Sequence, residues 1–356
     1  MTTVTILVVV VALAALAIGC QREAPPAPVA VAKVADIAEA NTSGGFVDSV
    51  ALAPDGSLVA TGQRNGPIRL WATADPKEPI ALDGRRQAIV DLAFAPGGSL
   101  LASLGRHRES ALRLWQPGER AGSRTWVEAA AVPVGRCLSL RFDGSGALLA
   151  VMCEREVLLV DVATRRESSR LSNPHKEDLT AFDLTPDGSK LLTAGHEGDV
   201  TLWDALAGTP IRTFSVAGSR RPGRPPAGMP APEVWAVVVA LSPDGSRAAA
   251  VTIEGTVYVW DTATGAELLA EADAEAGGPP TGSLKFARDG QLLAPRGDRY
   301  GMRLIDVPRK TSRKVTSGGR AYHTVAITND ATAFATVTSV VAGSTLTYDV
   351  EIWKIE

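Results

Sequence analysis

Cys137 and Cys153 have the spacing that most directly suggests chemistry, because a short turn separates the segments that carry them. Cys137 begins the segment CLSLRF, and Cys153 ends the segment ALLAVMC. In an antiparallel hairpin centred at residue 145, partners have residue numbers that sum to 290, which places the two cysteines opposite each other. Opposite residues lie about 4.5–5.5 Å apart, within reach of a disulfide. Two interpretations remain: a disulfide formed in an oxidising compartment, or two buried thiols separated by a one-residue register shift.

Other residue types that support catalysis or metal binding show no catalytic pattern. The sequence contains neither a nucleophile elbow nor a Gly-rich phosphate loop before a helix. Histidines fall in different segments without the spacing of metal ligands, at His107, His175, His196 and His323. We therefore expect no metal, no cofactor and no enzymatic activity.

Arg220, Arg221 and Arg224 lie close together in a Pro- and Gly-rich segment that ends at Trp235. A flexible basic loop of this kind suits an acidic peptide, a phosphate or an anionic lipid headgroup. The alternative is a surface loop without function, because long loops cost little free energy. Trp235, like Trp126 earlier in the chain, is either a contact residue or a core residue.

A segment that recurs seven times must position these residues. Each copy consists of an apolar strand, a tight turn, a second apolar strand and a third strand that ends near Trp-Asp. The turns are LAPDG, FAPGG, FDGSG, LTPDG, LSPDG, FARDG and ITNDA, separated by 42, 48, 42, 57, 45 and 41 residues. The closing positions repeat in step with them, at Trp71, Trp115, Val160, Trp203, Trp260, Ile305 and Trp353. A period in the low to mid forties is typical of four strands with their turns and predicts a β-propeller.

The turn residues and the ends of the repeat region extend this prediction. In these turns Pro sets φ, the Asp side chain forms a hydrogen bond with its own backbone, and Gly takes a positive φ. Ala331 replaces this Gly in the seventh turn, so we expect that turn to be strained or to have a different shape. Only three residues follow Trp353, so we expect residues 28–38 to supply the outer strand of the last blade. The sequence thus predicts an all-β, seven-bladed propeller of four-stranded antiparallel blades over residues 28–356, closed by an N-terminal strand.

The repeat resembles the WD-repeat β-propeller family over nearly all of residues 28–356. Trp203-Asp204 and Trp260-Asp261 keep the family's dipeptide intact. Members of the family often have a His and an Asp that join in a buried hydrogen-bond network. By this resemblance, His175 occupies the His position and Glu197 the Asp position of the same blade. It also implies a surface for binding protein partners, although one fold serves many functions.

The N-terminus concerns location. Residues 4–18 are apolar or small apart from Thr5, which is signal-peptide length and short of the about 20 residues that a spanning helix needs. The sequence LAIGC resembles a bacterial lipoprotein lipobox, which implies a signal peptide at residues 1–19, lipidation of Cys20 and a Pro-rich tether at residues 20–27. An uncleaved anchor or an ordinary cleaved signal are the alternatives.

The charge balance and the anchor together give the functional hypothesis. With 36 basic and 39 acidic residues, the chain has no electrostatic preference for nucleic acid. We expect a monomeric, non-enzymatic scaffold that binds envelope proteins or peptides and is held by its lipid in the bacterial envelope. Gln21 after the lipidated cysteine suggests the outer membrane, facing the periplasm. The alternatives are a periplasmic enzyme or small-ligand receptor that uses the central channel, and a largely structural envelope protein.

Overall fold

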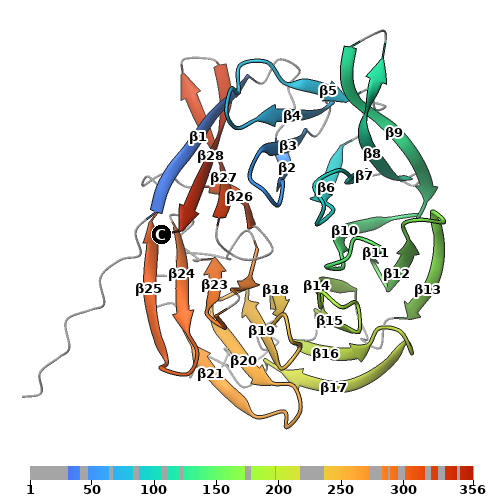
Figure 1. Ribbon diagram of the computed structural model, residues 1–356. Coiled ribbons are helices and arrows are strands. Elements are labelled where there is room, and N and C mark those ends of the chain that lie inside the picture. The colour runs from blue at the N-terminus through green and yellow to red at the C-terminus, as the bar shows by residue number, and fades with distance from the viewer. Residues whose placement is uncertain are drawn as a thin grey trace, which may run out of the picture.

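The computed structural model describes residues 31–40, 47–63, 67–82, 88–105, 111–120, 123–172, 178–196, 198–216, 236–272, 283–287, 289–295, 301–316, 322–327, 333–342 and 345–355. Every regular secondary-structure element in these ranges is a β-strand. The strands form seven four-stranded antiparallel sheets arranged around a central axis (Figure 1). The predicted all-β, seven-bladed propeller is therefore confirmed.

Each blade runs from an inner strand at the channel to an outer strand at the rim. The first four blades contain β2 (Val47–Leu52), β3 (Leu58–Gln63), β4 (Ile68–Ala72) and β5 (Ile80–Leu82); β6 (Ile89–Phe94), β7 (Leu101–Gly105), β8 (Ala111–Arg120) and β9 (Ser123–Pro133); β10 (Cys137–Phe142), β11 (Leu148–Cys153), β12 (Glu156–Asp161) and β13 (Arg166–Ser172); and β14 (Leu179–Leu184), β15 (Lys190–Gly195), β16 (Asp199–Asp204) and β17 (Thr209–Ser215). The last three contain β18 (Ala236–Leu241), β19 (Arg247–Thr252), β20 (Val257–Asp261) and β21 (Glu267–Glu271); β22 (Lys285–Phe286), β23 (Leu292–Pro295), β24 (Gly301–Asp306) and β25 (Thr311–Thr316); and β26 (Tyr322–Ile327), β27 (Ala333–Ala342), β28 (Thr345–Ile355) and β1 (Val31–Ala40).

The N-terminal strand closes the ring, as the sequence predicts. Strand β1 pairs antiparallel with β28, from Val31 opposite Ile355 to Ala40 opposite Thr347. Blade seven therefore joins the two ends of the propeller in one sheet (Figure 1). Without β1, the outer backbone edge of β28 would lack its partner strand, and exposed edges of this kind promote aggregation.

The turns between the first two strands have the predicted chemistry. In blade one the Gly56 N–H donates to the Ala53 carbonyl at 2.9 Å, and Gly56 has a φ of +72°. Asp55 accepts the Ser57 N–H at 2.9 Å, which fixes the chain as it leaves the turn. A type I turn followed by a left-handed Gly is a common hairpin connection. The same Gly conformation recurs in blades two to six, at Gly98, Gly146, Gly188, Gly245 and Gly290.

The hydrophobic core lies between neighbouring blades. Each closing residue of the repeat packs against the preceding blade, so that Trp203 of blade four contacts a cluster with Val157 and Leu159 of blade three. In four blades the closing indole also donates a hydrogen bond to a buried hydroxyl on the second strand, at Thr61, Ser103, Thr193 and Thr336. These bonds satisfy the only polar side-chain atom of each buried tryptophan.

Trp126 is a core residue rather than a contact residue. It is buried and packs edge-on against Phe94, with ring centroids 6.0 Å apart. It lies on the long outer hairpin of β8 and β9, whose pairing continues past the closing Trp115 as far as Arg120 and Ser123.

The predicted N-terminal segments and the seventh turn lie outside the described residues. These are the signal peptide at residues 1–19, the tether at residues 20–27 and the turn that contains Ala331. Within the ranges that the structure describes, no helix has the length and hydrophobicity to span a bilayer.

Candidate functional site: the central channel

One position of the channel wall, the residue directly before each turn motif, changes from alanine to a charged residue in some blades. In blade one this position is the fifth of the six residues of the inner strand, where it is Ala51. The equivalent residues are Ala51, Ala93, Arg141, Asp183, Ala240, Lys285 and Ala326 in blades one to seven. Blades seven, one and two therefore present a continuous run of alanines, and the charged residues come from blades three, four and six.

Arg141 is held to the wall by its neighbours in blades two to four. Its Nη1 atom donates to the Leu140 carbonyl at 2.7 Å and lies 3.3 Å from Asp91 Oδ2. The guanidinium carbon also lies 5.9 Å from the centre of the Phe182 ring. The Arg141 side chain remains about a third exposed, so its outer face is open to the channel.

Asp183 and Lys285 form an ion pair across blade five. Lys285 Nζ lies 3.3 Å from Asp183 Oδ1, and the second carboxylate oxygen accepts the Leu241 N–H at 2.9 Å. The exposed fractions are 4% for the Asp183 side chain and 18% for Lys285. Ala240 of blade five does not line the three channel cavities and is fully buried in the core between blades five and six.

Three cavities meet at these charges. Their volumes are about 300, 440 and 190 Å³, and all three are lined by Arg141 and Lys285. The cavity of 300 Å³ extends along the alanine side, where Ala51, Ala93 and Ala326 line it. The cavities of 440 and 190 Å³ include Asp183. Both cations thus lie in blades three and six, while the carboxylates Asp48 and Asp91 line the cavity of 300 Å³ from blades one and two.

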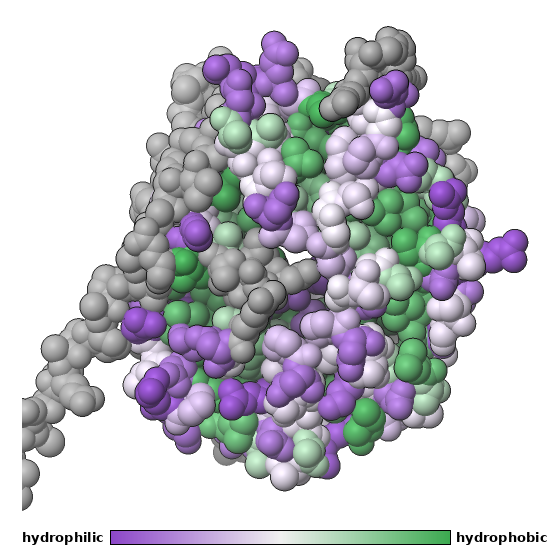
Figure 2. Space-filling view, in the orientation of Figure 1, coloured by the Kyte–Doolittle hydropathy of each residue, from purple (hydrophilic) through white to green (hydrophobic). Residues whose placement is uncertain are grey.

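The cavity of 440 Å³ forms a mouth on the side of the propeller that carries the hairpin turns. Its rim contains turn prolines and aromatic residues, at Pro54, Pro96, Pro186, Pro243, Phe94, Phe142 and Phe286. We call this space the turn-side mouth. Figure 2 shows the central opening. The coloured residues beside it are mostly hydrophilic or intermediate, and hydrophobic residues lie farther out.

The turn carboxylates around this side are held in their charged form. The Ser242 hydroxyl and the Ser246 N–H both donate to Asp244, and together they lower its pKa to about 2. The hydroxyl of Thr185 and the N–H of Ser189 act in the same way and lower the pKa of Asp187. These two turns therefore carry a negative charge at neutral pH.

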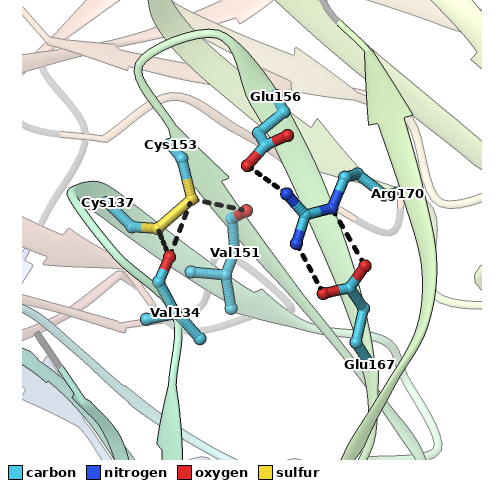
Figure 3. The surroundings of a disulfide bond; sticks show 7 residues. All are labelled: Val134, Cys137, Val151, Cys153, Glu156, Glu167 and Arg170. Carbon is cyan, nitrogen blue, oxygen red and sulfur yellow. Dashed lines mark hydrogen bonds and ion pairs between the residues drawn. A yellow bond between two sulfur atoms is a disulfide. The ribbon is translucent and has the colours of Figure 1, made fainter.

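Cys137 and Cys153 are joined by a disulfide in blade three (Figure 3). The hairpin register is one residue from the predicted sum of 290, because Leu140 faces Val151. A β-bulge between Cys137 and Ser139 restores the pairing of the two cysteines. The first strand has an equivalent irregularity in blades one, two, four, five and seven, so the bulge belongs to the repeat and not to the disulfide.

The other predicted site residues lie outside the described residues. This applies to Cys20, to the loop residues Arg220, Arg221, Arg224 and Trp235, and to the network residues His175 and Glu197. Among the residues that the structure describes, no group of three His, Cys, Asp or Glu side chains could hold a metal ion.

Comparison with known proteins identifies the repeat. The sequence model for "WD domain, G-beta repeat" matches residues 167–204, from the outer strand of blade three to the closing Asp204 of blade four. The propeller contains a WD repeat. The matched repeat begins one strand before blade four. One sequence repeat of this WD-repeat propeller therefore supplies the outer strand of blade three and the first three strands of blade four.

The curated relatives of this WD-repeat propeller are distant. It is 23% identical over 250 residues to human (Homo sapiens) echinoderm microtubule-associated protein-like 1, covering 70% of this chain and 27% of the relative. It is 24% identical over 261 residues to a guanine nucleotide-binding protein subunit beta of Zea mays, covering 69% of this chain and 63% of the relative. The match therefore spans less than two thirds of either relative. WD-repeat propellers generally act as scaffolds that bind protein partners.

The sequence prediction missed the charged residues of the channel, although the sequence contains their signal. Aligning the seven turns places an alanine in four repeats and a charged residue in three repeats at the same position, namely Arg141, Asp183 and Lys285. The pairing of Lys285 with Asp183 was not predictable in this way, because it skips a blade.

Proposed function

We propose that this WD-repeat propeller is a non-enzymatic scaffold that binds an envelope protein or peptide at the turn-side mouth. The observation that carries this proposal is the combination of an apolar rim and a charged floor in a cavity of about 440 Å³. Binding sites typically combine apolar walls with a few placed polar groups. The mouth has this composition, and its backbone is fixed by the closed ring and by the turn hydrogen bonds.

Lipidation of Cys20 and attachment to the bacterial envelope complete the proposal. The lipobox-like LAIGC and the Pro-rich segment after it support a tether between a membrane and the propeller. In the proposed arrangement, the propeller stays near the outer membrane and faces the periplasm, where it holds its partner. A Cys20→Ser variant should move from the membrane fraction to the soluble fraction, whereas Gln21→Ser should still fractionate with membranes. Retention of Cys20→Ser in the membrane would rule out the lipid anchor.

Photo-crosslinking in cells tests the binding site. A photoreactive amino acid at Pro186 would lie on the rim of the mouth. One at Leu206, which is 74% exposed, would lie on an outer turn of the same blade. We expect one partner to recur from position 186 and not from position 206. Equal capture from both positions would reject the mouth as the binding surface.

A small-ligand receptor is a second candidate, because the same charged cavities also suit a small molecule. The two functions differ in what occupies the mouth. A protein partner gives a crosslinked adduct of high mass, whereas a small ligand reduces crosslinking and copurifies with the protein.

A further inference from the structure

The two cations of the channel have hydrogen-bond donors that no described contact uses. Arg141 directs Nη1 to Asp91 and to the Leu140 carbonyl, and its Nε and Nη2 have no described partner. The Lys285 ammonium makes one described contact, with Asp183, and has three protons to donate. Both side chains border all three cavities. Each cation therefore has N–H donors that a ligand in the channel can use.

The acidic partners of these cations are also stabilised by neutral donors. Asp183 accepts the N–H of Leu241, and Asp91 accepts the N–H of Leu140 and the hydroxyl of Ser139 at 2.6 Å. Backbone N–H donors stabilise a carboxylate without neutralising its charge partner. The contacts of Arg141 and Lys285 within the wall therefore leave some of their N–H donors without a described acceptor.

The residues that line the turn-side mouth carry a net positive charge, although the turn carboxylates Asp187 and Asp244 lie on the same side of the propeller. Arg141, Lys285 and Asp183 are the charged residues that line this cavity, which gives a formal sum of +1. Asp48 and Asp91 line the cavity of 300 Å³ instead, farther along the channel. An anion that enters through the mouth reaches both cations before it reaches Asp48.

The surroundings of the cations suit an apolar group attached to that anion. Phe94, Phe142 and Phe286 line the mouth together with four prolines. Ala93 lines both the mouth and the deeper cavity, and its small side chain leaves space opposite the charged residues. Apolar walls lower the local dielectric constant and strengthen a charge-assisted hydrogen bond.

We infer that the turn-side mouth binds a carboxylate attached to an apolar body, with Arg141 and Lys285 donating to its oxygens and the alanine side holding the apolar part. This inference rests on the proposed binding function and gives the chemistry of the bound group. The carboxylate belongs either to the C-terminus of a polypeptide or to a small organic acid.

Isothermal titration of the disulfide-bonded propeller tests the inference with matched pairs of probes. The pairs are the peptide Gly-Ala-Val-Leu with a free or an amidated C-terminus, and hexanoate with hexanamide. We expect the free acid of at least one pair to bind at least tenfold more tightly than its amide. Preference for the free peptide alone assigns a polypeptide C-terminus, and preference for hexanoate alone assigns a small acid. Absence of binding by both acids, or equal binding of acid and amide, overturns the inference.

Variants of the two channel cations locate the site. Arg141→Met leaves Asp91 with its neutral donors, and the double variant Asp183→Asn with Lys285→Met removes both members of the ion pair. Each should weaken acid binding at least tenfold. Arg170→Gln is the matched control, because Arg170 pairs with Glu156 and Glu167 on the outer strands of blade three (Figure 3). Unchanged binding in both channel variants overturns the inference.

The scaffold proposal and the inference can fail separately. If the acids bind but no partner is crosslinked from position 186, the scaffold role is wrong and the carboxylate site stands. If a partner is crosslinked and neither acid binds, the carboxylate site is wrong and the scaffold role stands.

Discussion

The two sides of the channel wall are built on the same backbone but differ in chemistry. Blades seven, one and two have alanine before the turn, whereas blades three, four and six have Arg141, Asp183 and Lys285. The buried residues between blades repeat all around the ring, because every blade must pack on its neighbour. Features that the fold requires therefore recur in most blades, whereas the charged residues of the channel break the repeat.

The largest expected effect comes from opening the ring at blade seven, on the alanine side. Deleting residues 31–40 removes β1 and leaves the outer edge of β28 unpaired. We expect the melting temperature to fall by at least about 10 °C, since the loss of a whole paired strand amounts to several kcal/mol. Calorimetry measures this change. The control replaces residues 20–27 with a Gly-Ser segment. If the deletion variant has the same melting temperature as this control, closure of the ring by β1 is contradicted.

The next effect concerns the charged side of the channel. Asp183→Ala leaves Lys285 without its buried partner and the Leu241 N–H without its acceptor. We expect a loss of about 3–5 kcal/mol in the free energy of unfolding, the usual result of removing one member of a buried ion pair. Urea denaturation measures this loss. Asp183→Asn keeps an acceptor oxygen and should lose less, so equal losses would show that the N–H contact is not formed.

The disulfide of blade three is expected to contribute somewhat less. Replacing Cys137 and Cys153 together by Ala should lower the free energy of unfolding by about 3 kcal/mol, because the bond closes a loop with a sequence separation of 16. The change is measured by denaturation of the variant and of the oxidised wild type. Addition of reductant should destabilise the wild type and leave the double variant unchanged. Equal sensitivity of the two proteins to reductant would contradict this account.

The smallest effect is the pH dependence contributed by the turns. Since the pKa of Asp244 is lowered to about 2 in the folded protein, its contribution to stability is present above about pH 4 and is lost as the pH falls toward 2. The effect should stay below about 1 kcal/mol, because the side chain is exposed and solvent screens it. Denaturation at pH 5 and pH 2.5 should show a smaller difference for Asp244→Asn than for the wild type. A larger difference for the variant would reverse the predicted sign.

The repeat made most of the fold predictable from the sequence. Turn residues and closing tryptophans give seven blades, and the strand composition of residues 28–38 gives the closing strand, observed at Val31–Ala40. The bulge before Ser139 was not predictable, because no residue type marks it in the sequence, although the structure repeats it in other blades. Alignment of the repeats shows that Lys285 stands where other blades have alanine. Its contact with Asp183 joins blades that are not neighbours, so only the three-dimensional structure shows it.

The central claim is that the alanine side and the charged side form one binding site, and titration of an Ala93→Met variant tests it most directly. The longer side chain at position 93 would add volume to the alanine side of the mouth while the charged residues stay unchanged. In titrations with the better-bound free acid, the account predicts that Ala93→Met and Arg141→Met each weaken binding at least tenfold while both variants keep a cooperative thermal transition. Wild-type affinity in Ala93→Met would contradict it, because the ligand would then not occupy the space that the alanines leave.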